Sequence, residues 1–106
     1  MTIKQSDFSM RPYKETDFPA IHQLNQKEGW TNLAAKQDET KSAWNHSPIA
    51  FVAERDGEVI ACVRGLTDGS ISLYICELLV DEKERGKGIG QALLAYMHKL
   101  YPKTRM

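Results

Sequence analysis

The sequence predicts an α/β domain of the α+β type, with a mixed, mainly antiparallel sheet and the element order β-α-α-β-β-β-α. Apolar runs separated by short glycine-containing turns lie between residues 49 and 80, which is typical of an antiparallel meander. After Gly88 the apolar residues recur at helical spacing instead. Since 106 residues is the size of one ordinary domain, we expect a single domain over residues 1–106.

The first strand and the first helix follow from short patterns near the N-terminus. Apolar and polar residues alternate over Phe8–Tyr13, and Pro12 restricts this strand to a sheet edge because proline cannot donate a ladder hydrogen bond. A helix is then predicted with Thr16 or Asp17 as its capping residue and Gly29 as its end. Its apolar residues fall at helical spacing: Phe18, Ile21 and Leu24.

A second helix is predicted over Asn32–Trp44 from a weaker pattern. Its apolar face is narrow, because Lys36–Ser42 is almost wholly polar. Ser47-Pro48 then ends the helical segment, since the residue before a proline is biased toward extended backbone.

Three strands are predicted next. Asp56-Gly57 separates Ile49–Glu54 from Val59–Val63, and Asp-Gly between two apolar runs is a strong hairpin signal. A second turn over Thr67–Ser70 leads into Ile71–Val80. Because this last run is almost continuously apolar, it predicts a central strand buried on both faces.

A glycine-rich loop joins that strand to the last helix. Three glycines alternate with other residues after Arg85: Gly86, Gly88 and Gly90. Glycines let successive backbone N–H groups turn toward an anion, and the first N–H groups of a helix lack intrahelical partners. From Lys83 onward there are six basic residues and one acid, so the last quarter carries about +5 and the rest about −5. The sequence therefore predicts a cradle for a small polyanion.

Two common phosphate-binding motifs are excluded by their spacing. A P-loop requires Ser or Thr after its lysine, whereas Lys87 is followed by Gly88. The dinucleotide fingerprint requires a third glycine where this chain has Gln91 or Leu93, depending on the starting glycine.

The loop instead resembles the acetyl-CoA-binding motif of the GNAT family of N-acetyltransferases, Gln/Arg-x-x-Gly-x-Gly/Ala. Arg85–Gly90 fits that motif at every fixed position. The order of the elements, the Asp-Gly hairpin and the opening segment Met10–Tyr13 are also similar to the family. The resemblance covers the chain from about Ser9 to Tyr101.

The resemblance implies acetyl-CoA as cosubstrate, no metal, and direct attack of a small-molecule or peptide amine on the thioester without an acyl-enzyme. It assigns backbone contacts to the cofactor's pantetheine arm to Leu78, Leu79 and Val80. It assigns the pyrophosphate to a second group of residues: Arg85, Gly86, Lys87, Gly88, Ile89, Gly90 and Gln91.

Glu77 is the candidate catalytic residue. Members of the family often use a glutamate on or near this strand as the base for the amine, sometimes through water, and Glu77 is the one acid of the Ile71–Val80 run. The alternative interpretation is a strand carboxylate satisfied by local hydrogen bonds. Asp68 is a weaker candidate for an amine contact, against a role as an ordinary turn residue.

The family normally continues past the helix that matches the last one here, with a fifth strand, another helix and two closing strands. Because the sequence stops at Met106, we expect a C-terminally shortened member that lacks them. The preceding strand would then have an open edge, and we expect a homodimer or a partner chain to cover it. A non-catalytic CoA-binding or interaction module remains the alternative function.

Composition narrows the remaining classes. With 42% hydrophobic and 26% charged residues, the chain is typical of folded proteins, which argues against wholesale disorder. Its zero net charge argues against nucleic acid as a partner, and no apolar run has the length of a membrane span. Cys62 and Cys76 form neither a disulfide framework nor a metal-ligand pattern, so we expect small core residues in a cytoplasmic protein.

Overall fold

The structure is a computed structural model that describes residues 8–29, 36–68 and 70–102. Four strands form one antiparallel sheet in the order β1-β2-β3-β4: β1 (Ser9–Pro12), β2 (Ile49–Arg55), β3 (Glu58–Thr67) and β4 (Leu73–Val80). The helices in the described ranges are α1 (Phe18–Lys27), α3 (Gln37–His46) and α4 (Ile89–Leu100). Two single 3-10 turns precede α1 and α4: η1 (Glu15–Asp17) and η2 (Glu82–Glu84). The predicted fold class and element order are confirmed.

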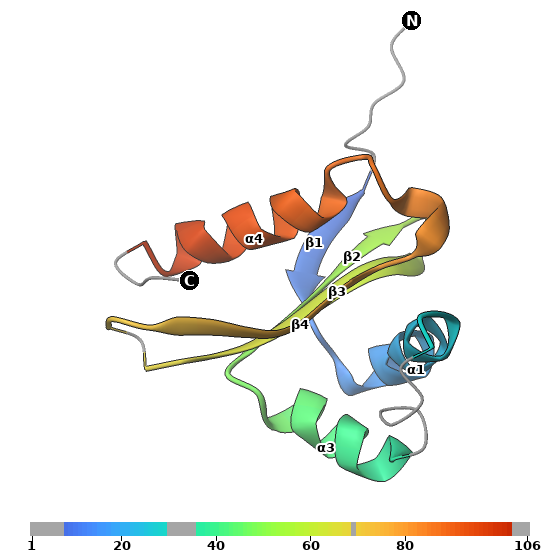
Figure 1. Cartoon of the computed structure of the whole chain (residues 1–106), viewed down its shortest axis with the longest axis horizontal. Helices are drawn as coiled ribbons and strands as arrows, with labels where there is room; N and C mark the ends of the chain where they lie inside the picture. Colours follow the sequence, from blue (N-terminus) through green and yellow to red (C-terminus); the bar gives the residue numbers. More distant parts are fainter. Residues whose placement is uncertain (1–7, 30–35, 69, 103–106) are drawn as a thin grey trace, which may run out of the picture.

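The sheet lies between two helical layers (Figure 1), with α4 on one face and α1 and α3 on the other. On the α4 side, Ile89, Leu93 and Met97 pack fully buried against the strands. The helix predicted after Gly88 is therefore confirmed, although Leu100 at its end is 46% exposed. On the opposite side, a second cluster buries four large side chains: Phe18, Ile21, Leu24 and Trp44. No helix in the described ranges is long and apolar enough to cross a membrane.

The hairpin between β2 and β3 forms as predicted. Asp56 and Gly57 both adopt left-handed backbone, with φ of 53° and 79°, which is the geometry of a type I′ turn. The twist of that turn matches the twist of the flanking strands, so the pair continues without splaying. The hairpin therefore holds Arg55, the last residue of β2, in a defined position.

The prediction of a central last strand is wrong, but its burial on both faces is confirmed, with Leu73 buried on the α4 side and Leu79 on the α1 and α3 side. Among the described residues β4 pairs only with β3, and Tyr74 on β4 is 68% exposed. The strand also contains a bulge, at which Arg64 pairs with Glu77 while Gly65 pairs with Ile75. Since the bulge inserts an extra residue, side chains on the α4 face change from odd to even positions, and no regular alternation remains in the sequence. The α4 face collects four of these side chains: Leu73, Ile75, Leu78 and Val80.

The N-terminal elements differ from expectation in detail. β1 is shorter than Phe8–Tyr13, although it is an edge strand as Pro12 predicted. Asp17 occupies the N-cap position of α1 without accepting a capping hydrogen bond. Its two carboxylate oxygens accept instead from the Arg11 guanidinium, at 2.8 Å each, because a bidentate charged pair is stronger than a neutral cap.

The second predicted helix is confirmed in part. α3 begins at Gln37 and continues to His46, two residues beyond the predicted Trp44, before the extended backbone of Ser47 ends it. The predicted start, residues 32–35, lies outside the described residues.

Candidate functional site

The candidate site is the turn between β4 and α4. The chain leaves β4 at Val80 and passes through η2, after which Arg85–Gly88 leads directly into α4. Gly86 and Gly88 both have φ of 80°, and a Cβ added to either would meet no atom within 4 Å. Both glycines therefore give the loop a left-handed backbone that other residues rarely adopt, and they border open space rather than packed atoms.

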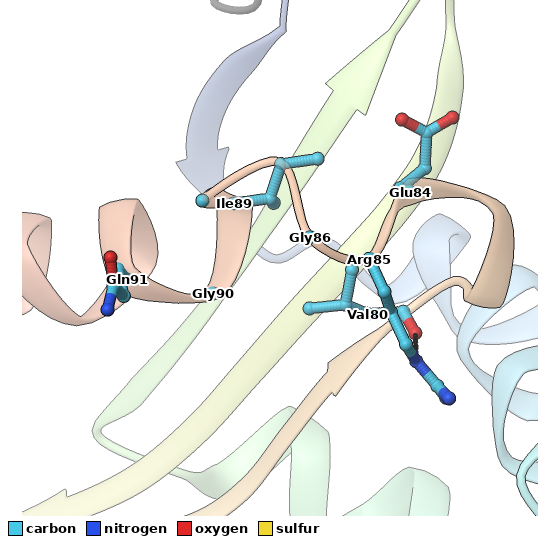
Figure 2. A pocket seen from close by; sticks show the side chains of 8 residues that line it. Val80, Glu84, Arg85, Gly86, Ile89, Gly90 and Gln91 are labelled. Carbon is cyan, nitrogen blue, oxygen red and sulfur yellow. Dashed lines mark hydrogen bonds between the residues drawn. The ribbon is translucent and has the colours of Figure 1, made fainter.

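A pocket of about 380 Å³ opens at this turn (Figure 2). Its lining residues are Val80, Glu84, Arg85, Gly86, Gly88, Ile89, Gly90 and Gln91. Seven of these eight were predicted from the sequence, and Glu84 was not. Three predicted cofactor contacts, Leu78, Leu79 and Lys87, do not line the pocket. Of these, Leu78 packs toward α4 and Leu79 is buried on the opposite face of the sheet.

The pocket contains the positive end of α4. Gly88 is the N-cap residue and has no side chain with which to cap the helix. The Gly88 carbonyl accepts from the N–H of Ala92 at 2.9 Å, so the N–H groups of Ile89, Gly90 and Gln91 precede the first intrahelical bond. Unpaired N–H groups at a helix N-terminus favour a bound anion.

Asp81 fixes the backbone where the chain leaves the sheet. Its own N–H donates to the Ile60 carbonyl at 2.8 Å, and its side chain accepts from the N–H of Lys83 at 3.1 Å. The same carboxylate, buried at 6% residue exposure, lies 3.5 Å from Nζ of Lys27 on α1. The turn is thereby tied to both β3 and α1.

Three charged side chains next to the pocket already form ion pairs: Glu84, Arg85 and Lys87. Arg85 donates through Nε to the Val80 carbonyl at 3.2 Å and forms an ion pair with Glu28, just after α1. Oε1 of Glu84 accepts from Nη1 of Arg55 at 2.6 Å and from Nζ of Lys87 at 3.4 Å. The Arg55 hydrogen bond lowers the pKa of Glu84, so this carboxylate is ionised at neutral pH.

Glu77 is buried and lies outside the pocket lining. Its Oε2 accepts from Nε of Arg64 at 2.5 Å, and Nη1 of Arg64 also donates to Oγ of Ser47 at 3.2 Å. No bulge separates Glu77 from Leu79, so Glu77 is on the α1 and α3 side of the sheet. The sequence identified the carboxylate but not its arginine, because the pairing depends on the register of two strands.

The surroundings of the other singled-out residues, Asp68 and the two cysteines, are those of residues with a structural role. One oxygen of Asp68, Oδ1, accepts from the N–H groups of Ser70, Ile71 and Ser72 at 2.9–3.1 Å, which is the arrangement of a turn residue. Cys62 is fully buried, and burial raises the pKa of its thiol well above the usual range; Cys76 is half-buried on β4. Within the described ranges, no three His, Cys, Asp or Glu side chains are grouped as metal ligands would be.

The sequence matches the model of the Acetyltransferase (GNAT) family over residues 10–104. No curated protein sequence matches the chain significantly.

Several solved structures share the fold. A GNAT-family acetyltransferase of Streptococcus pneumoniae superposes with a TM-score of 0.77 at 21% identity, covering 93% of this chain and 71% of that one. The PaiA N-acetyltransferase of Thermoplasma acidophilum, in complex with coenzyme A, gives 0.68 at 15% identity, covering 91% of this chain and 72% of that one. The ribosomal-protein-S18-alanine N-acetyltransferase of Escherichia coli also gives 0.68, at 16% identity. That match covers 91% of this chain but only 60% of the enzyme. At these identities the likeness establishes the fold.

Proposed function

The chain belongs to the GNAT acetyltransferase family, and from this we propose that it transfers an acetyl group from acetyl-CoA to a primary amine. The observation that carries the proposal is the pocket where β4 meets α4, which combines two open left-handed glycines with the positive end of a helix. The amine belongs to a small molecule or a peptide, and it attacks the thioester directly.

The proposed cofactor contacts follow from the chemistry of the turn. Backbone N–H groups over Arg85–Gln91 would hold the CoA pyrophosphate, because they combine unpaired donors with the helix dipole. The end of β4, from Leu78 to Val80, would pair its backbone with the pantetheine arm. This strand edge is unpaired among the described residues, so its backbone groups on that side are open to a ligand.

We assign to Glu77 the removal of the proton from the attacking amine, directly or through a water molecule. Its support is a carboxylate on β4, adjacent to the strand end that would hold the cosubstrate and fixed by Arg64 at 2.5 Å. A fixed carboxylate holds one geometry, which general base catalysis requires.

The first test is titration of the protein with acetyl-CoA, followed by a thiol-release assay with a panel of amines. We expect saturable binding near one per chain and thiol release with at least one amine. Binding without release, by a folded protein at known oligomeric state, would favour a non-catalytic CoA-binding module instead. A folded protein that does not bind acetyl-CoA would refute the assignment of the pocket.

Glu77→Gln tests the base. We expect kcat to fall by about 10²-fold or more while the affinity for acetyl-CoA stays within about twofold, because glutamine keeps the shape and loses the proton acceptor. Arg64→Gln is the matched control, since it breaks the same ion pair but leaves the carboxylate. If both variants lose the same activity and the same stability, the pair is structural and Glu77 is not the base.

We further propose that a second copy of the chain, or another partner chain, covers the open edge of β4. Three large apolar side chains near the β3–β4 turn are exposed: Leu66 at 47%, Ile71 at 68% and Tyr74 at 68%. An unpaired strand beside exposed apolar groups is a template for association. Analytical ultracentrifugation tests the proposal: a dimer that Tyr74→Lys dissociates is expected, and a monomer at high concentration would contradict a homodimer.

A further inference from the structure

We propose that Arg55 is a positioning residue that sets the anion affinity of the pocket by neutralising Glu84. Arg55 belongs to the β2–β3 hairpin and no motif of the glycine loop includes it. The inference rests on the proposed function, because it names a determinant of binding for the same polyanionic cosubstrate.

Glu84 is the single acid among the residues that line the pocket. In Figure 2 the Glu84 carboxylate points away from Gly86 and Gly90, so its charge lies beside the pocket, where its repulsion would still oppose the binding of a polyanion. The side chain of Glu84 is 14% exposed and cannot turn freely into solvent without breaking its contacts. The charge must therefore be compensated where it lies.

Arg55 supplies that compensation from a distant part of the sequence. Its Nη1 donates to Oε1 of Glu84 at 2.6 Å, and its side chain is 24% exposed. Arg55 is the last residue of β2, directly before the type I′ turn, and its guanidinium reaches a glutamate 29 positions later in the sequence. A charged hydrogen bond of this length in a partly buried site is stronger than an exposed surface pair.

Lys87 contacts the same carboxylate as Arg55, so the loss of Arg55 would also change the interactions of Lys87. Its Nζ lies 3.4 Å from the same Oε1, and its side chain is 40% exposed. With Arg55 present, the cluster Arg55–Glu84–Lys87 carries a net charge of +1 and Lys87 shares its carboxylate with a stronger partner. Without Arg55 the net charge of the cluster is zero, and Lys87 becomes the one cation paired with Glu84. Both the positive electrostatic field at the pocket and the availability of the Lys87 ammonium group to an anion are then reduced.

The test is a double-mutant cycle on binding of CoA and, separately, of inorganic pyrophosphate. We expect Arg55→Gln to weaken binding about tenfold, and Glu84→Gln to leave it unchanged or strengthen it up to about tenfold. The double variant should return to within about threefold of the wild type, because its net charge is again +1. Arg55→Lys should stay near the wild type, and all differences should shrink in 0.5 M salt.

A merely structural role for the ion pair predicts a different pattern. Loss of either partner would then disturb the turn in the same way. Binding of CoA and pyrophosphate would be equally weak in Arg55→Gln, Glu84→Gln and the double variant, and this result would overturn the inference. Lys41→Gln is the charge-matched control, since it also removes one cation from an ion pair. Lys41 belongs to α3, on the face of the sheet opposite α4, and its Nζ lies 3.1 Å from Oε2 of Glu15 in η1. An equal effect of Lys41→Gln would also overturn the inference, because the effect would then reflect net charge alone.

The cycle separates this inference from the proposed function. If the wild type binds pyrophosphate with the expected pattern but does not bind CoA, the inference stands and the function falls. If the wild type binds CoA and Arg55→Gln binds equally well, the function stands and the inference falls. If Arg55→Gln does not fold, Glu84→Gln decides: unchanged or tighter binding supports the inference, and weaker binding overturns it.

Discussion

An aspartate in place of Gly88 should weaken CoA binding much more than an asparagine at the same position. Gly88 lines the pocket with φ of 80°, and a Cβ there meets nothing within 4 Å. Asp and Asn both tolerate left-handed backbone better than other side chains and have nearly equal volume. We therefore expect each variant to lose about 1 kcal/mol of unfolding free energy or less. The aspartate should lose less than the asparagine, because its negative charge interacts favourably with the helix dipole.

The difference between the two variants isolates charge. A carboxylate about 5 Å from a doubly charged pyrophosphate repels it by about 1.7 kcal/mol at the dielectric constant of water. That energy corresponds to about a 15- to 20-fold weaker Kd for Gly88→Asp than for Gly88→Asn. Added bulk affects both variants alike, so it cancels from the ratio.

Isothermal titration with CoA at 50 mM and 500 mM salt measures this ratio, and thermal unfolding checks that both variants fold. The ratio should decrease at the higher salt concentration, because exposed charges are screened over a few ångströms there. Equal affinities of the folded Asp and Asn variants at low salt would show that no anionic group binds near Gly88. The assignment of the pyrophosphate to this turn would then be wrong.

Three further predictions concern stability, each measured as the free energy of unfolding in urea. Gly65→Ala should lose about 2 kcal/mol, because its Cβ would lie 2.8 Å from the Tyr74 carbonyl oxygen across the β4 bulge; an unchanged value would contradict this contact. Asn25→Leu should gain about 1 kcal/mol, since both amide atoms are buried without a partner in the described ranges, and a loss would reveal one. The Arg11 hydrogen bonds lower the pKa of Asp17 in the folded protein below its ordinary value of 3.8. The contribution of Asp17 to the free energy of unfolding is therefore complete above pH 3.8 and is lost as the pH falls through the lower pKa of the folded protein. Asp17→Asn should therefore lose less stability than the wild type between pH 7 and pH 2, and equal losses would refute the argument.

Much of the fold could be predicted because its signals are local. Asp56-Gly57 specifies a type I′ hairpin through two adjacent backbone conformations, and the spacing after Gly88 specifies one face of a helix. The glycine loop is equally local, since three glycines in five positions act on the backbone that they belong to. Seven of the eight residues that line the pocket were therefore identified from the sequence.

The position of β4 could not be predicted in this way. A continuous apolar run indicates a strand that is buried on both faces, but it does not show how many neighbours the strand has or whether it contains a bulge. Only the pairing with β3, in which Gly65 opposes Ile75 and Arg64 opposes Glu77, shows the bulge, and only the strand order shows that β4 has no second neighbour among the described residues.

The sequence by itself determined the order of the elements, the hairpin and the glycine-rich loop, because each depends on residues that are neighbours in the chain. Tertiary structure alone decided which charges meet. Glu77 pairs with Arg64, which is 13 positions away in the sequence, and Glu84 pairs with Arg55, which is 29 positions away. Such pairs follow from strand register and hairpin twist. The residues next to a carboxylate in the sequence therefore do not indicate which cation will lie beside it in the fold.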